Sequence, residues 1–204
     1  MAKSTFNNLD QHKQQQIIDA AILEFSKTLP NHINIQNIIR DAHIPRGSFY
    51  QYFENKEDLY LTIIDYISQK KQVFFMNHQL NYEQPFLSFI TDVYVLSYDF
   101  LLDHPILYKA GKNMMSFDYF KQFEFLKQAK IQTQTFYKSL IVKDQEKHLI
   151  NQDIDSDLLA DFMLDFMDTE KLDVFYTKGY TLHDFKIQIN KLITMLKKGI
   201  ETNV

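Results

Sequence analysis

The sequence predicts an all-α fold of about nine helices, in which a small N-terminal domain precedes a larger one. The chain has 204 residues, a length that accommodates both domains. It contains only 4 Gly and 4 Pro, whereas sheets and tight turns usually need more of both. Apolar residues also recur at helical spacing along most of the chain, which indicates amphipathic helices.

The N-terminal helices are marked by their apolar spacing and by their caps. A first amphipathic helix is predicted over residues 11–27. Asn34 is a favourable N-cap for a second, short helix over residues 35–42. Proline disfavours helical backbone in the residue before it, so Pro45 interrupts the chain here and suits the first position of a third helix. Asn55 then caps a fourth helix.

Longer, aromatic-rich helices follow after about residue 80. They are predicted near residues 84–103, 105–112, 117–147, 156–178 and 182–200. Gly179 is a natural residue to end one helix before the next begins. Thr181 with Asp184 resembles a capping box in which Asp takes the usual Glu position.

Composition excludes several classes of function. The chain has no Cys, which excludes disulfides, thiolate metal sites and cysteine nucleophiles. Neither a signal peptide nor a run of about 18 apolar residues is present, so no membrane partner and a cytoplasmic location are expected. The seven His are scattered without metal-ligand spacing, and no catalytic motif or glycine-rich phosphate loop occurs. The sequence therefore predicts no metal, no cofactor and no enzymatic activity.

The charge distribution limits how nucleic acid could be bound. The net charge is −4 overall, but residues 1–56 carry +1 and the remainder carries −5. This asymmetry has the sign expected of an N-terminal DNA-binding domain, although it is small. Any such surface must therefore be a local patch, because the field of the whole domain is weak.

The two short helices on either side of Pro45 predict a helix-turn-helix, since a third helix precedes them. Phe49 and Phe53, four residues apart, are expected to face the core with Ile38 and Phe25. The residues that are then left facing solvent or at the rim are Arg46, Gly47, Ser48, Tyr50, Gln51 and Tyr52. Arg and Gln side chains can read base edges, and hydroxyl groups can bind phosphates. Glycine would let the backbone approach DNA closely. The alternative is an ordinary corner of a helical bundle.

The segment RGSFYQYFENKEDL, residues 46–59, resembles the signature of TetR/AcrR-type regulators. In that family a basic residue is followed by Gly, then by Ser or Thr, and then by a run of aromatic residues. After this run come Asn or Ser, then Lys, and then Leu. The segments 17–25 and 34–42 are similar to the family's first two helices. The likeness covers about residues 17–60, where residue types agree at many consecutive positions.

The resemblance implies a helix-turn-helix DNA-binding domain in residues 1–56 and a ligand-binding and dimerisation domain in residues 57–204. It implies a repressor that binds double-stranded operator DNA as a homodimer and is released by a small effector. The phosphate contacts that it implies are made by Tyr50, Tyr52 and Lys56. Contacts to phosphate or a base edge are expected from Asn34 and Gln36. The residues it marks for base reading are Arg46, Ser48 and Gln51.

The sequence departs from the family pattern at several structural positions. His43 stands where the family has the turn glycine, and His tolerates a positive φ better than most residues. Pro45 replaces the Ser or Thr that usually caps the recognition helix, Leu29 replaces a glycine that ends the first helix, and Ile39 replaces an alanine. None of these changes removes an expected phosphate contact.

The larger domain is rich in Met and aromatic residues, which line adaptable apolar pockets as well as building cores. The resemblance places a cavity among these helices, and an apolar or aromatic ligand is expected. The candidate ligand-binding residues are Tyr94, Tyr98, Met114, Phe120, Phe123, Tyr137, Phe162 and Phe166. For each of them, a role in the core is the alternative.

The last two predicted helices carry apolar rows, which predict either an intramolecular hairpin or, as in the family, a homodimer interface.

The predicted helix from Asn55 to Met76 would link DNA binding to ligand binding, and a ligand that shifts it must favour one of two conformations. Two other readings stay open: a regulator of the same fold that responds to a protein or peptide, and an activator.

Overall fold

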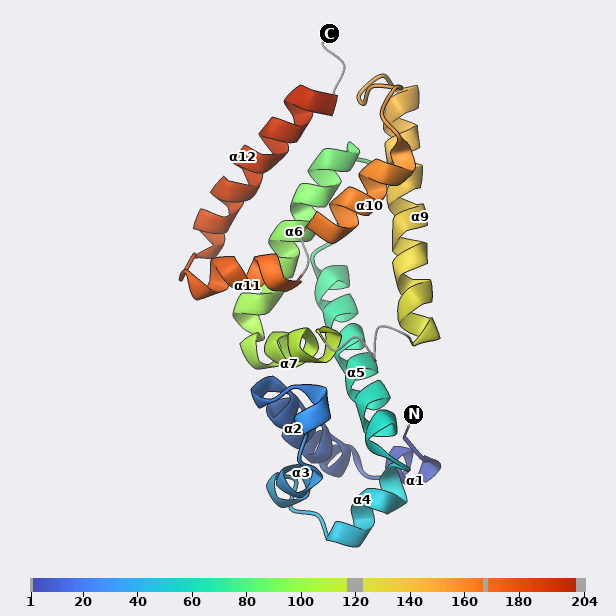
Figure 1. Ribbon diagram of the computed structural model, residues 1–204, viewed down its shortest axis with the longest axis vertical. Coiled ribbons are helices and arrows are strands. Elements are labelled where there is room, and N and C mark those ends of the chain that lie inside the picture. The colour runs from blue at the N-terminus through green and yellow to red at the C-terminus, as the bar shows by residue number, and fades with distance from the viewer. Residues whose placement is uncertain (1, 117–122, 167–168, 201–204) are drawn as a thin grey trace. The chain divides into compact units, whose positions relative to one another are not determined.

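The computed structural model describes residues 2–116, 123–166 and 169–200. The chain divides into two compact units, the first from residues 1–74 and 104–121 and the second from residues 75–103 and 122–204. Regular structure in the described ranges is helical throughout, with no strand (Figure 1). This confirms the all-α prediction. The first compact unit extends past residue 56, because it also contains residues 57–74 and 104–121.

The first unit holds the N-terminal helices and one later helix. Its helices are α1 (Ser4–Asn7), α2 (Gln11–Lys27), α3 (Ile35–Asp41), α4 (Arg46–Tyr52), the greater part of α5 (Lys56–Asn77) and α7 (Pro105–Met115). α7 lies against α2, and the Asn113 side chain donates to the Phe25 carbonyl at 2.9 Å. The Tyr60 hydroxyl donates to the Met114 carbonyl at 3.1 Å. A helix from the later sequence thus completes this unit.

The predicted core and caps of the helix-turn-helix are confirmed. Phe25, Ile38, Phe49 and Phe53 are all buried. The Asn34 side chain accepts from the Gln36 amide at 2.9 Å, and the Asn55 side chain accepts from the Asp58 amide at 2.9 Å. These bonds satisfy amides that have no partner inside their own helices.

The turn between α3 and α4 has the conformation that its residues favour, with one correction. His43 has a φ of 50°, a left-handed backbone that His tolerates better than most residues. Pro45 was expected at the first helical position, but it is the N-cap residue, with extended backbone at φ −60° and ψ 143°. α4 therefore begins one residue later, at Arg46, because the fixed φ of proline suits the extended region as well as the helix.

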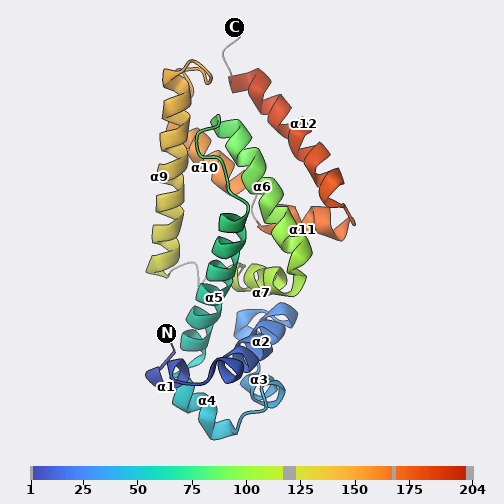
Figure 2. The ribbon, with the colours of Figure 1, turned by 180° about the vertical axis from the view of Figure 1, so that it is seen from behind.

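The second unit consists of α6 (Phe86–Asp103), α9 (Glu124–Glu146), α10 (Ser156–Phe166), α11 (Thr169–Thr177) and α12 (Leu182–Ile200). α6 contacts both α9 and α12, and α9 lies along α10 (Figure 2). The start of the helix predicted over 117–147 lies outside the described residues. The described part of the helix predicted over 156–178 comprises α10 and α11.

Buried hydrogen bonds tie the helices of the second unit together. The Tyr94 hydroxyl donates to the Met163 carbonyl at 2.6 Å, so this polar group is satisfied inside an apolar core. Asp144, 4% exposed, accepts from the Phe86 amide at 2.6 Å and so caps the start of α6.

The ends of the last helices match the predictions. The Asp184 carboxylate accepts from the Thr181 amide at 3.0 Å, and the Thr181 hydroxyl accepts from the Asp184 amide at 3.2 Å. The Thr181 hydroxyl also donates to the Asp184 carboxylate at 2.6 Å, and this bond, together with that of the Thr181 amide, lowers the pKa of Asp184 because both favour the charged carboxylate. Gly179 has a φ of 72°, as expected of a residue that follows a helix. None of the described helices combines the length and apolar composition needed to cross a bilayer.

Candidate functional site

A polar groove opens on the first unit between the start of α3, α4 and the start of α5. Its volume is about 420 Å³. The residues that line it are His32, Ile33, Asn34, Ile35, Gln36, Ile39, Arg46, Tyr50 and Lys56. Five of them, Asn34, Gln36, Arg46, Tyr50 and Lys56, are predicted DNA-binding residues. The fold therefore brings together side chains that lie up to 22 positions apart in the sequence.

A buried carboxylate fixes the α3 side of this polar groove. Glu24, only 5% exposed on α2, accepts from the Asn34 amide at 3.0 Å. It also accepts from the Asn37 side chain at 3.1 Å. Because the Asn34 oxygen already caps Gln36, the side-chain NH₂ of Asn34 is the group available as a donor to a ligand. The start of α3 is thus held rigidly on α2.

Lys56 and Tyr50 occupy the other side of the polar groove. The Lys56 ammonium donates to the Ile33 carbonyl at 2.9 Å, which holds the first residue of α5 beside the turn that precedes α3. An ammonium has three N–H donors, so this bond leaves capacity for an anion. The Tyr50 side chain is 54% exposed, and its ring meets the buried Phe49 ring edge-on at 5.3 Å. The Tyr50 side chain and the Lys56 ammonium therefore both border the polar groove.

The charge of the polar groove suits an anion. Of the nine described residues that line it, Arg46 and Lys56 are cationic and none is acidic. His32 is a further lining residue that sequence reasoning did not select. It lies two residues before Asn34, the N-cap of α3. This closeness in sequence to a predicted DNA-binding residue could have identified it. The described part of the chain has no group of three or more His, Asp or Glu suited to a metal ion.

The remaining predicted DNA-binding residues lie on α4 but outside the polar groove. Gly47 faces open space, since a Cβ built there would have no neighbour within 4 Å. Gln51 is exposed and Ser48 is half-buried. Tyr52 is also half-buried, with its ring 6.2 Å from that of Phe6. α4 therefore presents two faces, one bordering the groove and one packed on the N-terminal segment.

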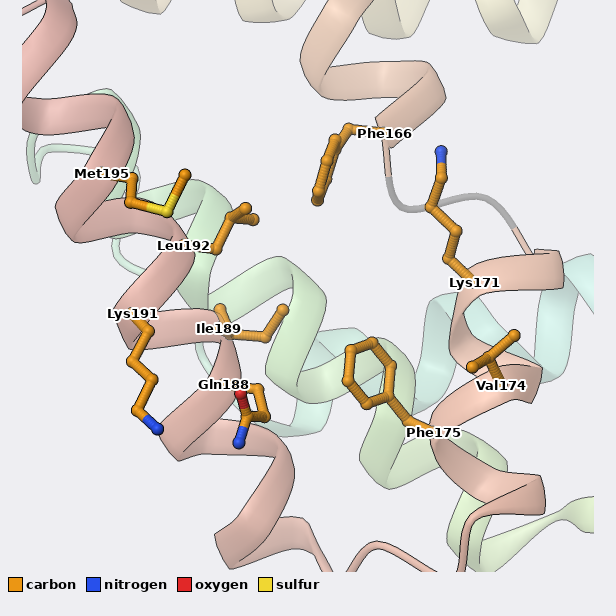
Figure 3. A pocket seen from close by; sticks show the side chains of 9 residues that line it. All are labelled: Phe166, Lys171, Val174, Phe175, Gln188, Ile189, Lys191, Leu192 and Met195. Atoms are coloured by element: carbon orange, nitrogen blue, oxygen red, sulfur yellow. The ribbon is translucent and has the colours of Figure 1, made fainter.

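An apolar groove of about 430 Å³ lies in the second unit between the end of α10, α11 and α12. Its lining residues are Phe166, Lys171, Val174, Phe175, Gln188, Ile189, Lys191, Leu192 and Met195. Figure 3 shows Phe166, Phe175 and Leu192 projecting toward a common space. The Lys171 ammonium lies over the Phe166 ring, 5.1 Å from its centre. Met195 is 70% exposed, so this groove opens at the surface.

The candidate ligand-binding residues are dispersed over the structure. Phe166 lines the apolar groove, and Phe162 is exposed on α10 with its ring 5.4 Å from that of Phe166. Phe123 is the N-cap residue of α9. Met114 is buried in the first unit, and Phe120 lies outside the described residues.

The three tyrosines among those candidates are buried in the second unit. The hydroxyls of Tyr94 and Tyr98 donate to backbone carbonyls, and that of Tyr98 reaches the Tyr180 carbonyl at 2.7 Å. The Tyr98 ring also stacks on Phe185 at 4.2 Å. Burial raises the pKa of Tyr94, and it raises the pKa of Tyr137 to about 12. These phenols stay protonated at neutral pH and hold the core together.

Comparisons with known proteins agree with this architecture. Residues 17–63 match the sequence profile of the family described as bacterial regulatory proteins, tetR family. A stretch of 92 residues is 29% identical to the uncharacterized HTH-type transcriptional regulator YuxN of Bacillus subtilis (strain 168). It covers 45% of this chain and 31% of that relative, so the chain matches about a third of the relative's length.

Solved structures share the fold along most of the chain. A TetR family transcriptional regulator from Chloroflexus aurantiacus J-10-FL superposes with a TM-score of 0.82 and 22% identity, covering 100% of both chains. The regulator FadR from Bacillus subtilis, in complex with stearoyl-CoA, has a TM-score of 0.64 at 17% identity, covering 88% of this chain and 96% of that one. Residues 17–63 thus match the tetR family, and the whole chain shares the fold of a solved TetR family regulator.

Proposed function

We propose that this protein is a cytoplasmic transcriptional repressor that binds operator DNA as a homodimer and releases it when an effector binds. The observation that carries DNA binding is the polar groove. It gathers an amide, a guanidinium, a phenol and an ammonium on one surface, with no acidic residue among its described lining. This donor set suits the oxygen atoms of a phosphate backbone.

In this proposal, α4 is the recognition helix and enters the major groove. Tyr50 and Lys56 bind phosphates on one strand, and the fixed ammonium of Lys56 supplies the charge. Tyr52 makes a further phosphate contact, and Asn34 and Gln36 contact phosphate or a base edge. Base reading is assigned to Arg46, Ser48 and Gln51, because guanidinium and amide groups recognise guanine and adenine edges. Gly47, which faces open space, allows close approach of the backbone.

A homodimer through the last helices is supported by exposed apolar side chains on the second unit. Leu158 and Met195 are each 70% exposed, and Phe162 is 46% exposed. Large apolar side chains that are left exposed in this way would be covered by a protein–protein contact. A two-fold dimer also has a geometric purpose, since two recognition helices must reach major grooves about 34–36 Å apart.

The second unit is the part that we assign to the effector. Its apolar groove, lined by Phe166, Phe175 and Leu192, suits a small apolar or aromatic molecule. FadR, whose structure shares this fold, was solved with stearoyl-CoA. The effector must bind the conformation with low DNA affinity more tightly than the other, and the coupling is reciprocal.

A protein or peptide effector is the second candidate, and the openness of the same groove favours it. Val174 and Met195, which line this groove, are 50% and 70% exposed. An open apolar groove accepts an amphipathic helix more readily than it encloses a metabolite.

DNA binding is tested with a duplex selected from a random pool by the purified protein. We expect the double variant Tyr50→Ala, Lys56→Ala to lose at least about 100-fold in affinity, because each protomer loses two phosphate contacts and each contact contributes on the order of 1.5–3 kcal/mol. The dependence of log affinity on log salt should also become shallower by about two, because each of the two protomers loses one lysine contact.

The matched control is Tyr82→Ala with Lys127→Ala, which removes an exposed tyrosine and an exposed lysine of the second unit. This control should bind the duplex as the parent does. Unchanged affinity and salt dependence in the folded Tyr50, Lys56 variant would exclude the proposed DNA-binding surface.

A further inference from the structure

The N-terminal segment of the chain has no part in the function described so far, yet it is firmly attached to the first unit. Phe6 of α1 is only 3% exposed. Its ring lies 5.1 Å from that of Phe53 and 6.2 Å from that of Tyr52. The Ala2 amide donates to the Thr62 hydroxyl at 3.2 Å. The segment therefore lies against the end of α4 and the start of α5.

The bonds from this segment go to the end of α4. The last four carbonyls of a helix have no partner inside that helix. In α4 one of them, that of Phe49, accepts from the Phe53 amide at 2.9 Å. The other three accept from the N-terminal segment: Tyr52 from the Lys3 amide at 2.8 Å, Tyr50 from the Lys3 ammonium at 3.1 Å and Gln51 from the Thr5 hydroxyl. A distant part of the sequence thus caps α4 completely.

α4 depends on such support for a physical reason. It has only seven residues, and Pro45 at its start provides no side-chain cap. Isolated helices shorter than about 12 residues are marginal in water, because nucleation fixes several residues for few hydrogen bonds. The Lys3 ammonium near its C-terminal carbonyls also complements the negative end of the helix dipole.

We propose that residues 2–6 are a positioning device for the recognition helix, in which Lys3 and Thr5 cap its carbonyls and Phe6 anchors the segment. This inference rests on the proposed DNA-binding role of α4. Apparent affinity falls with the fraction of molecules in the binding-competent conformation. Loosening the end of α4 should therefore weaken DNA binding without removing any contact to DNA.

Thr5 provides the sharpest test, because its side chain is exposed and uncharged. Thr5→Val removes the hydroxyl at nearly constant shape, and Thr5→Ser restores it. Ser4→Ala is the matched control, since it removes a neighbouring exposed hydroxyl. Two quantities are measured on the full chain: amide hydrogen exchange of residues 49–53 without DNA, and affinity for the selected duplex over a range of salt concentrations.

We expect Thr5→Val to accelerate exchange at the end of α4 by about threefold to tenfold, the effect of losing one net hydrogen bond. Affinity should fall measurably, by no more than the same factor for each protomer, with an unchanged salt slope, because no phosphate contact is lost. Thr5→Ser and Ser4→Ala should match the parent in both measurements.

Two results would overturn the positioning role. One is unchanged exchange in Thr5→Val, and the other is faster exchange with full affinity. Failure of the DNA-binding proposal is distinguishable, because it requires the Tyr50, Lys56 variant to retain affinity, and that result does not depend on exchange at the end of α4.

Discussion

The two grooves of this protein have nearly the same size and opposite chemistry. The polar groove of the first unit measures about 420 Å³ and the apolar groove of the second about 430 Å³. The first is lined by donors on short helices that buried bonds hold in place, such as that of Glu24 to the Asn34 amide. The second is lined by Phe166, Phe175 and other apolar side chains of α10 to α12. Volume alone therefore does not reveal function; the chemistry and rigidity of the lining do.

This difference suits different roles for the two units, DNA binding in the first and assembly or effector response in the second. A surface that binds a regular, charged polymer benefits from donors fixed before binding, because ordering them later costs affinity. A surface that binds an effector or a second subunit benefits from apolar area and adaptable side chains. Changes in one unit should therefore affect DNA contacts, and changes in the other should affect assembly or effector response.

The largest effect is expected from Phe162→Ala in the second unit. Phe162 is 46% exposed on α10, so the change should cost the monomer little. Burial of a Phe side chain in the dimer would contribute about 1.5–3 kcal/mol for each copy. We expect dissociation into monomers at concentrations where the parent is dimeric, measured by analytical ultracentrifugation.

The exposed Ile131 on α9 offers a control, because Ile131→Ala removes a similarly exposed apolar residue that lies outside the last helices. Equal self-association of the Phe162→Ala variant and the parent would contradict the proposed dimer interface.

A smaller effect is expected from Glu24→Ala in the first unit. Loss of this buried carboxylate leaves the Asn34 amide and the Asn37 side chain without their acceptor. Hydrogen bonds to a charged group contribute about 1.5–3 kcal/mol each, so the free energy of unfolding should fall by at least that amount, measured by urea denaturation.

The same variant sharpens the comparison between the units. Because the start of α3 would lose its support, affinity for the duplex should fall while self-association stays at the parent level. Asp19→Ala, which removes an exposed carboxylate of the same helix, should change neither property. Weakened self-association in Glu24→Ala with full DNA affinity would argue against these different roles for the two units.

Much of the first unit could be predicted because its signals are local. Caps such as Asn34 and Asn55 act within three residues of themselves. The turn at His43 depends on the backbone of one residue. Five side chains of the polar groove also lie within residues 17–60, the stretch whose residue types resemble the family, so the match of residue types selected them. The same holds for the capping box at Thr181.

The features that sequence reasoning missed depend on distant pairs. Phe6 could not be connected with Tyr52, because no periodicity links α1 to α4. Met114 was assigned to the larger domain, but α7 folds onto α2 in the first unit. The apolar groove contains Val174 and Gln188, which no motif marks. Apolar spacing predicts which helices are amphipathic, but it does not show which helices meet.

The central claim is that the polar groove and α4 form the surface that binds DNA. It is tested most directly by amide hydrogen exchange of the parent protein with and without the selected duplex. We predict slower exchange in residues 34–56 when DNA is bound. The exchange rates of α10 to α12 should be the same with and without DNA. Protection centred on α10 to α12, with residues 34–56 unaffected, would contradict the claim.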